Sequence, residues 1–319
     1  MAFEATVSGN GQSIVLKNNL SGSFAEILSF GALLNKFCIQ KDGELVNVID
    51  GFETAEEAPA LITSSFKSAK LSPFVCRMRN GAFVFENKTY RVSKFYLGKH
   101  AIHGLLFNAN FAIKNTTADE LSATVVLYFH YQEKAEGFPF SFEAEITYRL
   151  EANCKLTLIT RITNTGPEKM PLSDGWHPYF KLGAQIDELF FQMNSDQMVA
   201  FDSELLPTGV LRAYPFFKRP APLKNVSLDN CFLLHSFGEP ACILTDRKLG
   251  LAISILPKKS YPYLQLFTPD HRKSIAIENL SSPPDAFNNK TGLIIVDPGG
   301  SEIFETSYEI TQPANPYHS

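Results

Sequence analysis

Apolar and polar side chains alternate along much of this chain, and the dominant period is two residues. The clearest run covers residues 142–150, where apolar and polar residues alternate strictly. This pattern is typical of a strand with one buried face. Residues 151–155 then read as a turn, and residues 156–162 as the strand that returns. We therefore predict an antiparallel hairpin at this position.

Similar short runs recur along the chain, and most are separated by glycine, proline, asparagine or aspartate. They cover residues 13–16, 24–28, 33–39, 82–85, 123–131, 189–192, 241–245, 252–256, 264–267, 275–278 and 303–310. Helical patterning is scarce, although residues 54–58 fit one capped turn that ends before Pro59. Many short strands with regular turn signals predict an all-β fold, an antiparallel sandwich or barrel.

Composition indicates a large core and argues against several kinds of partner. The 319 residues are 45% hydrophobic and 19% charged, and 27 of them are phenylalanine. The formal net charge of -4 gives no reason to expect nucleic acid or an anionic membrane as a partner. No apolar run approaches the roughly 18 residues that a membrane-spanning helix needs. We expect one domain across residues 1–319, with an ordered core of about 5–312 and a loose tail over residues 312–319.

The cysteines and the first residues bear on the cellular compartment. The five cysteines are scattered and form no Cys-x-x-Cys pair, which predicts reduced thiols and neither a disulfide framework nor a zinc site. The first residues lack a basic region followed by an apolar one, so no signal peptide is visible. Both observations favour a cytoplasmic protein.

His177 is the first candidate for chemistry, since it stands between the single tryptophan, Trp176, and Pro178. Proline disfavours a helical conformation at the preceding residue and cannot donate to a ladder, so His177 is expected at a strand edge or end. On a strand, His177 and Tyr179 would face one way, and Trp176 and Phe180 the other. Such a histidine can exchange a proton near neutral pH, unless it is simply satisfied within the core.

Glu278 is the partner that we expect for His177. It stands at the end of an apolar strand, after residues 275–277, so its carboxylate emerges from a desolvated setting. Desolvation raises the pKa of a carboxyl group and makes it a better base. The alternative is a glutamate satisfied by backbone amides of the turn at 281–285. We predict that His177 and Glu278 are an acid and a base facing one small substrate.

Three further positions carry side chains suited to a ligand. His103 precedes Gly104, which permits close backbone approach. Arg77 offers five fixed donors for vicinal hydroxyls or a carboxylate, and Asp229 can accept hydrogen bonds from two sugar hydroxyls. The alternatives are a solvated strand end for Arg77 and a simple turn for Asp229. His100 and His103 lack further ligands at suitable spacing, so we expect no metal site.

These residues form an ordered series that resembles the aldose 1-epimerase (galactose mutarotase) family over nearly the whole chain. The matching positions are Cys76-Arg77-x-x-Asn80-Gly81-x-Phe83, Tyr90, His100-x-x-His103-Gly104, His177-Pro-Tyr-Phe180, Asp229-Asn-Cys-Phe232, Glu278, Pro284-Asp-Ala-Phe-Asn288 and Pro298-Gly299. Two positions depart from the pattern. Trp176 stands where many members have asparagine. Members also often carry two arginines around the first motif, but here only Arg77 matches, and Arg79 falls at no ligand position.

The resemblance implies a large antiparallel β-sandwich of the supersandwich type. It also implies interconversion of the α and β anomers of an aldohexose such as galactose or glucose, without a cofactor or metal. Glu278 would be the base at the anomeric hydroxyl and His177 the acid at the ring oxygen. The residues that would hold the sugar are His103, Arg77 and Asp229. The implied partner is the sugar alone, bound to a monomer or homodimer.

Three alternative functions stay open. A hexose-6-phosphate 1-epimerase would need an arginine cluster around the phosphate. A non-catalytic carbohydrate-binding protein would keep Arg77 and Asp229 but would not need both Glu278 and His177. A glycosidase with Asp229 and Glu278 as its carboxylate pair would leave the histidines without a role.

Overall fold

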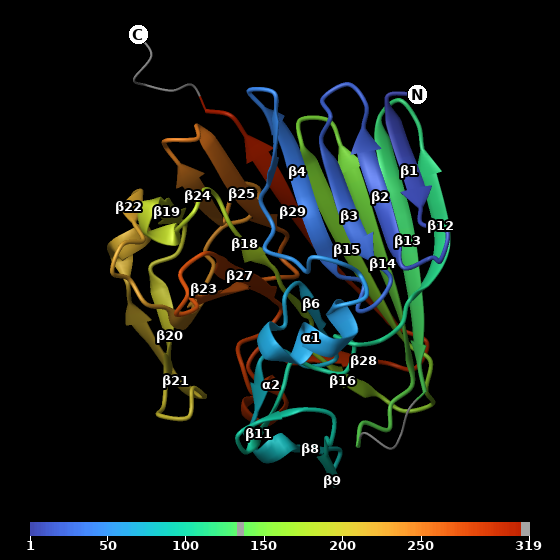
Figure 1. Ribbon diagram of the computed structural model, residues 1–319. Coiled ribbons are helices and arrows are strands. Elements are labelled where there is room, and N and C mark those ends of the chain that lie inside the picture. Colours follow the sequence, from blue (N-terminus) through green and yellow to red (C-terminus); the bar gives the residue numbers. More distant parts are fainter. Residues whose placement is uncertain (133–136, 314–319) are drawn as a thin grey trace.

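Strands dominate the structure, a computed structural model that describes residues 1–132 and 137–313 (Figure 1). Within these residues the named strands of the three large sheets pair antiparallel with their neighbours. The predicted all-β, antiparallel class is therefore confirmed. Residues 314–319, most of the tail that we expect to be loose, lie outside the described residues.

The largest sheet has nine strands in the order β12-β13-β14-β15-β29-β25-β24-β19-β22. The predicted hairpin is confirmed as β14 and β15, and buried and half-buried residues alternate all along β14. Strand β29 lies between β15 and β25 and joins the two halves of the sheet. The strands are β12 (Ala112–Ala118), β13 (Ser122–Tyr131), β14 (Phe142–Glu151), β15 (Lys155–Asn164), β29 (Ser301–Thr311), β25 (Leu251–Pro257), β24 (Cys242–Asp246), β19 (Phe190–Met193) and β22 (Ala221–Pro222).

A five-stranded sheet, in the order β1-β2-β3-β4-β5, packs against β13 and β14. Ile14 and Leu16 of β2 share one apolar core with Ile146 and Tyr148 of β14, which explains why both strands alternate in burial. The strands are β1 (Phe3–Val7), β2 (Ser13–Asn18), β3 (Phe24–Leu28), β4 (Leu34–Lys41) and β5 (Glu44–Asn47).

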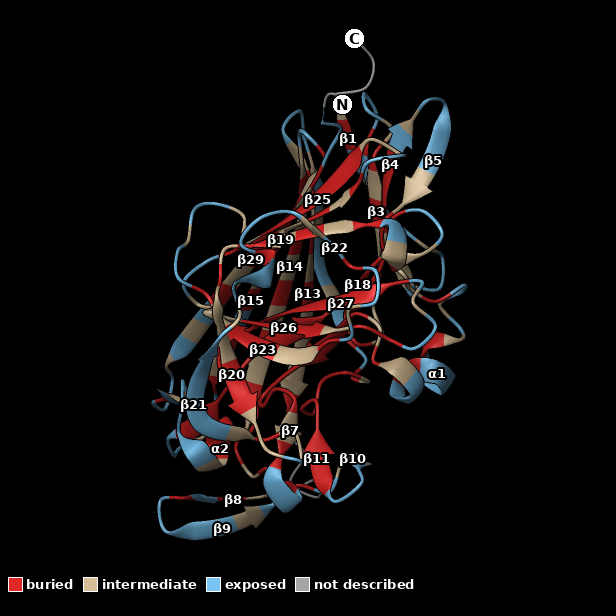
Figure 2. Ribbon diagram, turned by 90° about the vertical axis from the view of Figure 1, so that its left-hand side faces the viewer, coloured by how far each residue is buried: buried red, intermediate tan, exposed pale blue. Residues whose placement is uncertain are grey.

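An eight-stranded sheet forms the centre of the molecule, with the path β21-β20-β23-β26-β27-β17-β6 and β18 paired to β27. It packs against β29, where the hydroxyl of Thr306 donates to Asn279 and the ring of Tyr308 contacts Phe180. Figure 2 shows β26 and β27 largely buried, whereas β21 is exposed. The strands are β21 (Pro207–Ala213), β20 (Gln197–Phe201), β23 (Asp229–Leu233), β26 (Tyr263–Phe267), β27 (Ile275–Leu280), β17 (Gly175–His177), β6 (Ala69–Leu71) and β18 (Tyr179–Phe180).

The smaller sheets and helix α2 lie toward the lower end of the molecule in Figure 1, whereas α1 lies near its middle. The small sheets are β10-β11-β7, β8-β9 and β16-β28. Their strands are β7 (Arg77–Met78), β8 (Ala82–Phe85), β9 (Lys88–Arg91), β10 (Tyr96–Leu97), β11 (His100–Ile102), β16 (Met170–Leu172) and β28 (Ile294–Val296). The helices are α1 (Ala58–Ser65), α2 (Ala286–Asn289) and the 3-10 turns Arg79–Gly81, Ile186–Glu188 and Pro215–Phe217.

The expectation of a capped turn over residues 54–58 is partly right: residues 55–57 form a turn, but it has no side-chain cap and leads directly into α1 instead of ending before Pro59. Helix α1 begins where that turn was expected to end, and Pro59 lies in its first turn. Proline fits there because its missing N–H has no partner within the helix at that position. The helix ends at Ser65, and the capping residue Phe66 has a left-handed backbone and donates its N–H to the carbonyl of Ile62. No helix among the described residues is long and apolar enough to cross a membrane.

Candidate active site

All five predicted site residues line one cavity of about 230 Å³ on the eight-stranded sheet. They come from five separate segments: β7, the loop after β11, β17, β23 and β27. The fold therefore brings together side chains that are widely separated in the sequence. These residues are Arg77, His103, His177, Asp229 and Glu278.

His177 and Glu278 lie side by side in the lining of this cavity. The Nε2 atom of His177 is 3.3 Å from Oε1 of Glu278, and the two residues are 5% and 2% exposed. His177 ends β17, and the chain resumes as β18 after Pro178, so the predicted strand end is confirmed. Glu278, in contrast, lies within β27 and not at its end, because Asn279 and Leu280 continue the ladder with β26.

The side chains around His177 alternate as predicted. His177 and Tyr179 both line the cavity, with ring centroids 5.0 Å apart. Trp176 and Phe180 point the other way, into the apolar core. The tryptophan that replaces the family's usual asparagine therefore does not line the cavity. Gly175 allows close packing next to this strand, since a Cβ there would lie 2.6 Å from a side-chain carbon of Leu280.

Burial favours the neutral forms of both His177 and Glu278. It lowers the pKa of His177 to about 4. Burial, and then the nearby charge of Asp229, raises the pKa of Glu278 well above its ordinary value. The direction predicted for Glu278 is confirmed. The pair therefore favours a single mobile proton shared between a carboxyl group and an imidazole, in place of two opposite charges.

His103 stands beside His177, with ring centroids 5.0 Å apart. Burial lowers the pKa of His103 well below its ordinary value. Its backbone φ is +65°, and Cys76, whose carbonyl accepts a hydrogen bond from the His103 N–H at 3.0 Å, has a φ of +49°. Residues other than glycine seldom adopt such angles, and they persist where the surrounding structure enforces them.

The close approach that we expected at Gly104 is made to the protein's own backbone. A Cβ at this position would lie 2.4 Å from the carbonyl oxygen of Ser72. The N–H of Leu105 donates to the same oxygen at 2.7 Å. Gly104 thus fixes the loop that places His103 in the cavity lining, and a ligand contact by His103 stays a prediction.

Gln265 is a cavity residue that the sequence analysis missed. It lies on β26, opposite Glu278 on one side and Cys231 on the other. Its amide donates to Oδ1 of Asp229 at 2.7 Å, while burial raises the pKa of Asp229. The oxygen of the Gln265 amide is buried with no hydrogen-bond partner among the described residues. The sequence did hold a signal for this residue: Gln265 is the single strongly polar side chain within the otherwise apolar run Tyr263–Phe267.

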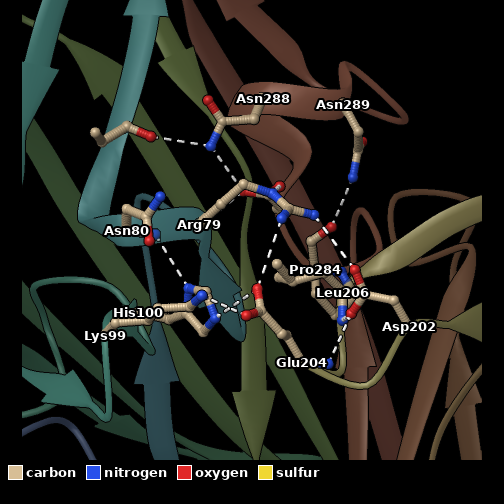
Figure 3. Close-up of polar contacts among 12 residues, drawn as sticks. Arg79, Asn80, Lys99, His100, Asp202, Glu204, Leu206, Pro284, Asn288 and Asn289 are labelled. Carbon is tan, nitrogen blue, oxygen red and sulfur yellow. Dashed lines mark hydrogen bonds and ion pairs between the residues drawn. The ribbon is translucent and has the colours of Figure 1, made fainter.

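Two segments, residues 95–97 and 201–205, contribute apolar side chains to the cavity lining, and we call these side chains the rim. The rim comprises Phe95, Leu97, Phe201 and Leu205. Ion pairs brace it from outside (Figure 3): Glu204, next to Leu205, contacts three cationic or titratable side chains, two from the segment after β10 and one from the turn after β7. These are Arg79, Lys99 and His100.

His100 belongs to this brace and not to the cavity. Its Nδ1 accepts a hydrogen bond from the N–H of Asn80 at 3.0 Å, so the ring proton is on Nε2, which lies 3.6 Å from Glu204. Arg79 also lies outside the cavity, close to Asp202, as its lack of a family match suggested.

Comparisons with known proteins point to the same family over nearly the whole chain. The sequence profile of aldose 1-epimerases matches residues 12–309. An aldose 1-epimerase from Streptococcus thermophilus is 26% identical, with 95% of each chain covered. The crystal structures of a galactose mutarotase-like protein from Clostridium acetobutylicum and a galactose 1-epimerase from Lactobacillus acidophilus superpose with TM-scores of 0.85 and 0.82, each at 19% identity. They cover 97% and 98% of this chain, and 98% of each neighbour, and they show a common fold.

Proposed function

This chain belongs to the aldose 1-epimerase family, and we propose that it interconverts the α and β anomers of a free aldohexose such as galactose or glucose. The observation that carries the proposal is the 3.3 Å separation between Nε2 of His177 and Oε1 of Glu278 in one buried cavity. Arg77, His103 and Asp229 surround the same space with groups that bind hydroxyls.

Anomer exchange needs an acid and a base close together. The ring opens when one proton leaves the anomeric hydroxyl oxygen O1, another reaches the ring oxygen O5, and the C1–O5 bond breaks. Because O1 and O5 are bonded to the same carbon, the two catalytic groups must be neighbours. In this scheme Glu278 removes the proton from O1 while His177 protonates O5. Rotation about C1–C2 and closure on the other face reverse both transfers.

One mobile proton is enough for the complete cycle. Ring opening converts a Glu278 carboxylate and a His177 imidazolium into a carboxylic acid and a neutral imidazole, and ring closure converts them back. Burial favours the neutral forms and so stabilises the pair at the open-chain stage. Hydrogen bonds from the bound sugar would stabilise the charged forms. The scheme uses no cofactor or metal.

The charges in the cavity favour a neutral sugar. Arg77 is the one lysine or arginine among the described residues that line it, and it faces the carboxyl groups of Asp229 and Glu278. A phosphate group is normally held by several cationic side chains. We therefore favour free aldoses over hexose 6-phosphates as substrates.

Polarimetry tests this function directly. The protein should accelerate the change in optical rotation of freshly dissolved α-D-galactose or α-D-glucose with no added cofactor. Glu278→Gln and His177→Asn should lose the acceleration while keeping a cooperative unfolding transition. Wild-type rates in both variants would disprove the assigned roles. A parallel panel of hexose 6-phosphates should show slower turnover than the free sugars.

Matched controls are available on the surface. His235 pairs with Asp196, and Glu188 pairs with Lys248, both outside the cavity. His235→Asn and Glu188→Gln remove the same functional groups and should leave mutarotation unchanged.

A further inference from the structure

The second carboxylate oxygen of Glu278 has a neighbour that the proposed reaction does not use. The Sγ atom of Cys76 lies 3.9 Å from Oε2, while Oε1 faces His177. Cys76 is 5% exposed and lines the cavity. Burial, followed by the charge of Glu278, raises the pKa of this thiol well above its ordinary value. The thiol therefore keeps its proton and is a hydrogen-bond donor, not a nucleophile.

The backbone holds this thiol in place. Cys76 has a φ of +49°, a strained value for a residue with a side chain. Its carbonyl accepts the hydrogen bond from His103, and the next residue, Arg77, enters β7 and pairs with Ile102. One short segment thus fixes the thiol relative to Arg77 and His103, the two proposed sugar ligands. The backbone therefore sets the contact between Cys76 and Glu278.

We propose that Cys76 is a positioning residue for the general base: its S–H donates to Oε2 of Glu278 and turns Oε1 toward His177 and the anomeric hydroxyl. This inference rests on the proposed mutarotase function. A thiol is a weak donor, so it favours the carboxylate form only modestly. A stronger donor would make Glu278 a weaker base. Without a donor, burial would hold Glu278 more firmly in its protonated form.

Other charged or titratable groups also face Glu278, and they come from four strands. Arg77 lowers and Asp229 raises the pKa of the carboxyl group by charge alone, whereas Cys76 contacts it through a hydrogen bond. These groups are Arg77 on β7, His177 on β17, Tyr179 on β18, and Asp229 and Cys231 on β23. All of them remain in a variant that changes Cys76, so the effect of the thiol can be measured separately.

The test compares Cys76→Ala and Cys76→Ser by following kcat and KM for galactose mutarotation across pH. Cys76→Ala should lower kcat about three- to tenfold, the equivalent of one hydrogen bond, with KM nearly unchanged. It should also move the alkaline limb of the profile to higher pH, because a carboxyl group without its donor holds the shared proton more tightly. Cys76→Ser should keep most of the activity and move the same limb to lower pH.

Cys242→Ala removes a buried thiol from β24, in another sheet, and should leave the profile at its wild-type position. Identical pH profiles for wild type, Cys76→Ala and Cys76→Ser would overturn the inference, as would equal shifts in both variants. These results differ from a failure of the proposed function, in which the wild-type protein itself would not accelerate mutarotation.

Discussion

Lys70 and Asp174 form an ion pair with no exposed surface, directly behind the strand that carries His177. Lys70 lies opposite Trp176 in the β6–β17 ladder, and its Nζ is 4.3 Å from the centre of the indole ring. The hydroxyl of Tyr261 donates to the same Asp174 oxygen at 2.6 Å. Burial lowers the pKa of Lys70 to about 8, and Asp174 opposes that shift. The role of Trp176 is therefore structural: its ring packs on the buried ammonium of Lys70 and anchors β17.

Asp174→Asn should be strongly destabilising, because it leaves the Lys70 ammonium buried without its counter-charge. Loss of one partner from a buried pair typically costs about 3–5 kcal/mol. Urea unfolding near neutral pH measures the difference. Asp196→Asn is the matched control, since its pairs with Lys218 and His235 are partly exposed and should contribute less than about 1 kcal/mol. A loss for Asp174→Asn no larger than the control would contradict this view.

The two buried histidines, His103 and His177, should reduce the free energy of unfolding as the pH is lowered from about 6.5 toward 4. The unfolded protein binds protons on His103 and His177 in this range, whereas the folded protein keeps both imidazoles neutral, since burial lowers the pKa of His177 to about 4. The contribution of the two histidines to the free energy of unfolding is fully present above about 6.5, the pKa of histidine in the unfolded protein. It is lost progressively below that pH. For His177 the loss is roughly 3 kcal/mol, at about 1.4 kcal/mol per pKa unit.

Urea unfolding at several pH values tests that dependence. His177→Asn should show a smaller decline between pH 6.5 and 4 than the wild-type protein. The same decline in both would mean that His177 is readily protonated in the folded state.

Glu204→Gln should loosen the apolar rim without touching the acid and base. The substitution removes the charge that holds the turn carrying Leu205 against Lys99 and Arg79. Because these pairs are partly exposed, KM should rise only about two- to fivefold, with kcat nearly constant. High salt should raise KM in the wild-type protein in the same direction. A fall in kcat at unchanged KM would show that Glu204 acts on the chemistry and not on the rim.

Asp229→Asn should weaken sugar binding while leaving the acid and base in place. It removes a charged acceptor next to Gln265. Hydrogen bonds to charged groups are worth about 1.5–3 kcal/mol, so kcat/KM should fall roughly 10- to 100-fold, mainly through KM. Steady-state polarimetry at several sugar concentrations separates the two constants. An unchanged KM would remove Asp229 from the set of sugar ligands.

The sequence predicted where the strands lie better than it predicted which residues of adjacent strands face each other. Period-two patterning located β14 and β15 and the facing of His177, because burial on one face of a strand is a local property. It missed Gln265, whose place beside Glu278 depends on the register between β26 and β27. It also missed the contact of Cys76 with Glu278, which a left-handed backbone creates and no spacing encodes.

Strand β29 has a consequence for how the protein is made. It lies between β15 and β25, and both of those strands are synthesised before residues 301–311. Until then, each half of the nine-stranded sheet presents a bare edge of unpaired N–H and C=O groups, which are prone to aggregation. The sheet can close only after translation has passed residue 311, so both edges stay open to pairing with other chains until then.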